Sequence, residues 1–168
     1  MKVKDTYEFF TKEFEFKGKH AIMCSAMWEK NVPENSYFQR LIDIYRIAPI
    51  IGFRMNYKAP IDTSTTDTKS IFDAQMRSAK DELDFILQMI LMQEYSDTLD
   101  VKSCIDLAFR GAETEEQYLE YYTLFNDYVR GGVEILYEHL VIKQSEPKEH
   151  YLHPKTANII NFVKSFVK

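Results

Sequence analysis

FNDYVRGGVEILYEHL, residues 125–140, is the stretch that decides the fold. Its apolar residues recur at the three-to-four spacing of an amphipathic helix, although Gly131 and Gly132 stand side by side in the middle. A glycine costs a helix about 1 kcal/mol relative to alanine. Because the apolar stripe stays in phase across the pair, we expect one helix to continue through both glycines and a second helix to approach them closely.

The second helix is predicted over residues 35–57, NSYFQRLIDIYRIAPIIGFRMNY. Its apolar residues fall on one face, and Pro49 and Gly52 lie in the same part of it. Proline removes a backbone donor, so we expect a kink at Pro49, with a complete break as the alternative. Together, these two segments predict a helix-crossing point made by Pro49, Gly52, Gly131 and Gly132.

The remaining pattern is also helical. Further helices are predicted over residues 19–30, 69–95 with a joint near Ser78, and 101–111. TEEQ at residues 114–117 is a capping box that opens the long glycine-containing helix. Pro154 is typical of a helix start and precedes the C-terminal helix. No segment has a pattern of alternating apolar and polar residues that convincingly predicts a strand.

Three further segments complete the fold prediction: the N-terminal residues, the loop before the C-terminal helix, and a central apolar segment. Residues 1–18 are predicted to be a short helix or an extended arm, and residues 143–153 a polar loop. Residues 83–95 are apolar nearly all round, which is typical of a helix at the centre of a bundle. We therefore predict an all-α, single-domain bundle of about five to seven helices spanning residues 1–168.

Composition limits the class of protein. The chain has 168 residues, 45% of them hydrophobic, and a net charge of −5. An acidic chain argues against direct nucleic-acid binding, which depends on neutralising phosphates. Cys24 and Cys104 lie far apart in a chain without a secretory signal, and no stretch reaches the roughly 20 apolar residues that span a bilayer. We expect a cytoplasmic protein with reduced thiols and no membrane segment.

No motif identifies a reaction. His20 with Cys24, and His150 with His153, are loose pairs that do not supply the three or four ligands of a zinc site. RGGVE at residues 130–134 lacks the spacing and the lysine of a phosphate-binding loop. We therefore expect no metal, no cofactor and no catalytic residue, which favours a protein that is not an enzyme.

Several charged residues lie within strongly apolar helices and form the candidate polar cluster. Asp43 with Arg46 can pair at i,i+3, and Arg130 with Glu134 at i,i+4. Structural ion pairs between helices are the simpler interpretation, and a polar pocket or partner surface is the alternative. The complete set is Asp43, Arg46, Arg54, Arg110, Asp127, Arg130 and Glu134.

Four stretches within residues 17–140 also carry a resemblance: YFQRLIDIYRIAPIIGFRMNYKAPID, ELDFILQMILM, IDLAFRG and FNDYVRGGVEILYEHL. Together they resemble small all-helical accessory proteins of bacterial phage-defence and DNA-modification gene clusters. The resemblance implies a helical subunit that works beside nucleases, ATPases or modification enzymes. It assigns no functional residues.

Three functions follow as hypotheses. The first is a non-enzymatic helical adaptor or subunit of a bacterial multiprotein system that defends against foreign DNA, with protein partners or further copies of itself. The second is a helical enzyme, a nuclease or a nucleotide-handling protein, that uses the Arg, Asp and Glu side chains of the polar cluster. The third is a small-ligand sensor with a pocket between its helices.

Overall fold

The computed structural model describes residues 7–28, 30, 36–143 and 153–167. The prediction of an all-α bundle is confirmed, with one small sheet added to it. Along the chain the elements are β1 (Phe14–Lys17), α1 (Lys19–Met27), α2 (Leu41–Arg54), β2 (Thr68–Ile71), α3 (Asp73–Ser78), α4 (Lys80–Glu94), α5 (Val101–Arg110), α6 (Glu115–Tyr137), the π-helical turn η2 (Glu138–Ile142) and α7 (Pro154–Ser165).

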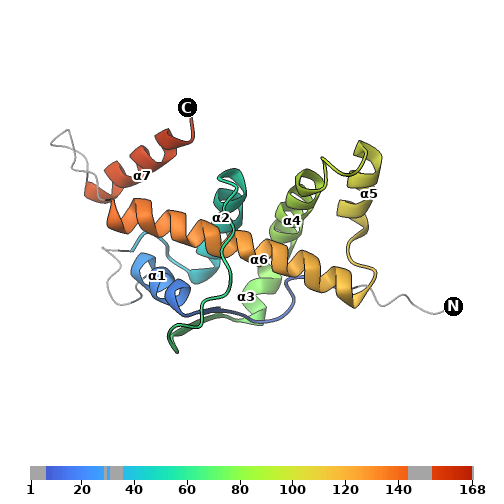
Figure 1. Cartoon of the computed structure of the whole chain (residues 1–168). Helices are drawn as coiled ribbons and strands as arrows, with labels where there is room; N and C mark the ends of the chain where they lie inside the picture. Colours follow the sequence, from blue (N-terminus) through green and yellow to red (C-terminus); the bar gives the residue numbers. More distant parts are fainter. Residues whose placement is uncertain (1–6, 29, 31–35, 144–152, 168) are drawn as a thin grey trace.

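Helix α6 is the axis of the molecule. Figure 1 shows it running across the whole bundle, and α1, α2, α4 and η2 pack against it. Its start follows the predicted cap, because the Thr114 hydroxyl accepts a hydrogen bond from the Gln117 amide at 3.2 Å. The helix continues unbroken through Gly131 and Gly132, as predicted, and both glycines are buried.

Helix α4, predicted at the centre of the bundle, lies instead at its side. Only one face is buried, through Leu83, Leu87, Ile90 and Leu91. On the other face Phe85 is 59% exposed and Met89 46% exposed. An apolar composition allows a helix to be covered on all sides, but the neighbours of α4 cover one side only, and the central position belongs to α6.

A two-stranded antiparallel sheet replaces two segments that were predicted otherwise. β1 pairs with β2 in the register Phe14↔Ile71, so the predicted helix 69–95 begins with a strand. Phe9, Phe10, Phe14 and Phe16 are buried, so the described part of the predicted arm packs on the core. Because β1 alternates buried and exposed side chains over only four residues, its period-two signal is short.

The other predicted boundaries hold in part. The helix predicted from residue 35 begins at Leu41, and it passes through Pro49 without a break. The joint near Ser78 is confirmed, since α3 ends there and α4 begins two residues later. Pro154 occupies the first turn of α7, as predicted. The predicted polar loop 143–153 lies outside the described residues except at its two ends.

The predicted crossing of α2 and α6 is confirmed in detail. A Cβ atom on Gly132 would lie 1.8 Å from the Ala48 carbonyl oxygen, and one on Gly52 would lie 2.2 Å from the Tyr128 carbonyl oxygen. These distances are far below van der Waals contact, so only glycine allows the two backbones to approach this closely. Pro49 is buried at the same crossing.

Candidate functional site

The candidate site lies where an extended segment crosses α6. We call residues 55–67, between α2 and β2, the strap. The Ala59 amide donates to the Asp127 carbonyl at 3.0 Å, and the Ala59 carbonyl accepts from Arg130 Nε at 2.9 Å. A Cβ atom on Gly131 would lie 2.0 Å from the Tyr57 carbonyl oxygen. The glycine pair therefore serves two contacts, Gly132 with α2 and Gly131 with the strap.

The far part of the strap is tied to the start of α1. The Lys19 amide donates to Asp62 Oδ2 at 2.6 Å, so this carboxylate caps the helix from a distant part of the sequence. Gly18 has a φ of +58°, and a Cβ atom there would lie 2.1 Å from Asp62 Oδ2. Hydrogen bonds from the Lys19 amide and from Ser64 lower the pKa of Asp62, which therefore stays ionised.

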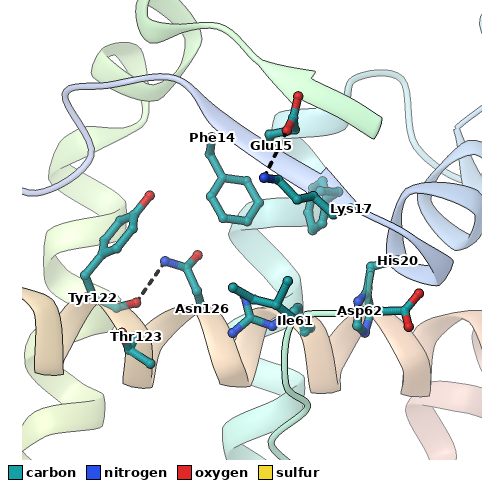
Figure 2. A pocket seen from close by; sticks show the side chains of 11 residues that line it. Phe14, Glu15, Lys17, His20, Ile61, Asp62, Tyr122, Thr123 and Asn126 are labelled. Carbon is teal, nitrogen blue, oxygen red and sulfur yellow. Dashed lines mark hydrogen bonds and ion pairs between the residues drawn. The ribbon is translucent and has the colours of Figure 1, made fainter. Parts of the chain in front are cut away.

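A cavity of about 150 Å³ lies between β1, α6 and the strap. Figure 2 shows Phe14 and Tyr122 along one side of it, with Ile61, Asn126 and Thr123 below. Lys17 and Glu15 form an ion pair of 3.5 Å at the β1 side. The complete lining is Phe14, Glu15, Phe16, Lys17, His20, Ile61, Asp62, Tyr122, Thr123, Asn126 and Arg130.

The buried polar side chains of the cavity wall are held by the protein itself. Asn126 accepts from the Tyr45 hydroxyl at 2.8 Å and donates to the Tyr122 carbonyl at 2.8 Å. Arg130 is 7% exposed and pairs with Asp127 as well as with the Ala59 carbonyl. Among the described residues, no buried side-chain nitrogen or oxygen lacks a hydrogen-bond partner. The fully buried polar atoms of the site are therefore satisfied within the protein.

Glu134 joins three elements next to the cavity. Lys19 Nζ lies 2.8 Å and His20 Nε2 2.9 Å from its Oε1 atom, and the Tyr57 hydroxyl donates to Oε2 at 2.8 Å. Burial acts to raise the pKa of Glu134, but the hydrogen bonds from Lys19, Tyr57 and His20 outweigh it, and the pKa lies below its ordinary value. Burial also lowers the pKa of His20, so its imidazole is neutral at pH 7.

The predicted polar cluster is not one cluster. Asp43 lies 2.7 Å from Arg40 and 3.6 Å from Arg46, which also pairs with Glu82 on α4. Elsewhere, Arg54 donates to the Phe166 carbonyl at 3.0 Å, and Arg110 lies 3.9 Å from Glu113. These four residues stabilise separate helix contacts.

Only Asp127, Arg130 and Glu134 border the candidate site. The predicted Arg130–Glu134 pair does not form, because Arg130 pairs with Asp127 and Glu134 with Lys19, His20 and Tyr57. The partners of Glu134 from α1 and the strap cannot be read from the spacing along one helix, whereas Asp127 lies at the local i,i+3 spacing from Arg130. Asn126 could have been recognised from the sequence as a buried polar residue, since it is uncharged and lies between Phe125 and Tyr128 of the apolar stripe.

The two residues weighed as a metal pair have other roles. His20 contacts Glu134, and Cys24 is fully buried, which raises the pKa of its thiol and leaves it unreactive. Both cysteines are free. Over the described ranges, no group of three His, Cys, Asp or Glu side chains is placed to hold a metal ion. Within the same ranges, no helix is long and apolar enough to cross a membrane.

Comparison with known proteins does not extend this description. No protein-family model, no curated protein and no solved structure matches the chain.

Proposed function

We propose that this protein is a non-enzymatic helical adaptor that binds another protein through α4 and α5. The observation that carries the proposal is an apolar stripe on the outer face of α5. Val101, Ile105 and Phe109 follow one another at i,i+4 spacing and are 77%, 44% and 62% exposed. Contiguous exposed apolar surface of this kind is typical of interaction sites.

The neighbouring helix α4 also exposes large apolar side chains. Phe109 lines a hollow of about 320 Å³ together with Asp84 and Gln88 of α4. The neighbouring outward positions of α4 are Phe85 and Met89, which are exposed as well. We call Phe85, Met89, Val101, Ile105 and Phe109 the hairpin surface. Figure 1 shows α4 and α5 side by side at one end of the bundle, away from α1 and α7.

The partner that fits this surface is an amphipathic helix of another protein. The hollow lies between α4, α5 and residues 7–9 and has a mixed polar and apolar lining, and the exposed apolar stripe of α5 beside it would accept the apolar face of a third helix. The exposed charges of α5 beside the stripe are Lys102, Asp106 and Arg110, and Arg110 is already paired with Glu113, so these charges balance and do not select the sign of the partner.

The candidate polar cluster supports an adaptor better than an enzyme. Asp43 and Arg46 pair with each other, Arg54 with a carbonyl and Arg110 with Glu113, and the four do not converge on one cavity. A nuclease or a nucleotide-handling enzyme needs such groups around one substrate. The resemblance of the sequence to accessory proteins of bacterial phage-defence clusters suggests, as part of the proposal, that the partner is a nuclease, an ATPase or a modification enzyme.

The proposal is tested with two matched double variants. Ile105→Ser with Phe109→Ser removes the centre of the hairpin surface, while Ile159→Ser with Val163→Ser removes two exposed apolar residues at the same spacing on α7. Tagged chains would be used to isolate partners from the source cells, and each partner found would then be purified and titrated against wild type and both variants.

We expect a purified partner to bind the wild type and the α7 variant equally, and the α5 variant at least about tenfold more weakly, a loss of roughly 1.4 kcal/mol. Equal binding of the α5 variant would reject the hairpin surface. A wild-type dimer that the α5 variant dissolves would assign the surface to a second copy and reject the adaptor.

A further inference from the structure

The cavity between β1, α6 and the strap offers a second binding site, distinct from the hairpin surface. Its apolar lining consists of the rings of Phe14, Phe16 and Tyr122 and the side chain of Ile61; Figure 2 shows Phe14, Tyr122 and Ile61 around it. Phe14 and Phe16 are buried and packed edge to face with ring centroids 4.9 Å apart, so this wall is preformed. Preformed apolar walls with a few fixed polar groups are typical of small-molecule sites.

The charges around the cavity differ in how fully they are engaged. The Asp62 carboxylate accepts from the Lys19 amide at 2.6 Å and from the Ser64 hydroxyl at 2.7 Å. Glu15 pairs with Lys17, and His20 contacts Glu134. The carboxylates that face the cavity are therefore already supplied with donors, and a ligand cation would have to compete for them.

Arg130 differs from these groups, because its guanidinium carries five N–H donors and not all of them are engaged. In the part of the chain that the structure describes, one bond from Nε reaches the Ala59 carbonyl and one from Nη2 reaches Asp127. The other N–H groups are available to a ligand, and the guanidinium lines the cavity. A carboxylate is the acceptor whose planar shape matches such a group.

The size of the cavity limits the rest of the ligand. A volume of about 150 Å³ is close to the apolar cavity that holds a single benzene ring in an engineered protein. A more open hollow of about 440 Å³, lined by residues 58–61 of the strap, shares Ile61, Thr123 and Arg130 with the cavity. A ligand larger than one ring would extend into this hollow past Ile61.

We propose that this cavity binds a small organic carboxylate with a single ring or a branched chain of similar size, whose apolar part lies against Phe14, Phe16 and Tyr122 and whose carboxylate bonds to Arg130. The site would give the chain a small-ligand response in addition to its protein contact. Because it does not include the hairpin surface, its failure would leave the adaptor proposal standing.

Benzoate is the probe, and benzyl alcohol is the uncharged molecule of similar shape. We expect saturable benzoate binding to the full chain by calorimetry or NMR titration, with a dissociation constant of about 1 mM or lower and about tenfold tighter than for benzyl alcohol. Absence of saturable benzoate binding would overturn the proposal. Equal binding of benzyl alcohol would overturn the role of the carboxylate and of Arg130.

Two variants on α6 locate the binding. Thr123 is exposed and lines the cavity, so Thr123→Trp is expected to fill it and to remove benzoate binding. Leu119→Trp, one turn earlier and outside the lining, is the control and should bind like the wild type. Benzoate binding that survives Thr123→Trp would overturn this location.

Arg130→Lys tests whether the planar pair of guanidinium N–H donors binds the carboxylate of the ligand. Lysine keeps the positive charge and loses the planar pair of donors, so we expect benzoate to bind about tenfold more weakly, with benzyl alcohol unchanged. If this variant unfolds because the strap is released, the comparison of the two probes and the Thr123→Trp variant still decide the proposal.

Discussion

The crossing of α2 with α6 and the pairing of α4 with α5 are built in opposite ways. At the crossing, backbone meets backbone through Gly52 and Gly132, and Ala48 is fully buried. In the α4–α5 pair, the buried residues of α5 are the small Cys104 and Ala108, while the large Val101, Ile105 and Phe109 face outward. The backbone contact between α2 and α6 therefore stabilises the fold, whereas the outward apolar surface of α5 adds little to the stability of the isolated chain.

The largest expected effect is at the crossing. Helix propensity alone predicts that Gly132→Ala stabilises α6 by about 1 kcal/mol. The new Cβ atom would instead lie 1.8 Å from the Ala48 carbonyl oxygen, which is backbone and cannot rotate away. We expect overpacking to dominate and the free energy of unfolding to fall by about 3 kcal/mol or more, measured by urea denaturation.

Leu119→Ala on the exposed face of the same helix is the control, with an expected change within about 0.5 kcal/mol. A neutral or stabilising Gly132→Ala would mean that the helices can separate at no cost, and the contrast between the two regions would then disappear.

An intermediate effect is expected at Glu134, which joins α1, α6 and the strap. Glu134→Gln weakens three hydrogen bonds to a charged acceptor, and we expect a loss of about 1–2 kcal/mol at pH 7. The pKa of Glu134 is lowered in the folded state, so its stabilisation is present above the unfolded pKa of about 4.3 and is lost as the pH falls through the folded value.

The difference in stability between wild type and Glu134→Gln should therefore shrink when urea denaturation is repeated at lower pH, below about 4.3. A difference that stays constant down to the acid limit would contradict a charge effect. Glu116→Gln, an exposed carboxylate in the first turn of α6, is the control: it removes only the interaction with the helix N-terminus, about 0.3–1 kcal/mol, so its loss at pH 7 should be smaller.

These contacts also explain how far the sequence alone predicts the structure. The crossing was predictable because glycine and proline in an apolar helix have few explanations other than close approach, and the apolar stripe stayed in phase across Gly131 and Gly132. The capping box at Thr114 was predictable because it is local. The position of α4 was predicted wrongly, since composition does not say on how many sides a helix has neighbours.

The candidate site was less predictable because its contacts are distant in sequence. Arg130 and Glu134 were expected to pair with each other, but Arg130 pairs with Asp127 and the strap, and Glu134 with the strap and α1. Asp62 caps α1 from 43 residues further along the chain. The four-residue strand β1, which brings Phe14 and Phe16 to the cavity, depends on β2 for its hydrogen bonds, and neither strand has a distinct pattern alone.

The smallest expected effect is at the hairpin surface. The Ile105→Ser, Phe109→Ser variant removes large apolar side chains that are mostly in water already, so the free energy of unfolding should change by no more than about 0.5 kcal/mol per site. Leu87→Ala, on the buried face of α4, is the matched comparison and should cost about 2–4 kcal/mol. If the serine variant is destabilised as much as Leu87→Ala, then Ile105 and Phe109 stabilise the monomer itself, and the outward apolar surface needs no partner to explain it. A nearly unchanged stability leaves recognition as the reason for exposing these side chains.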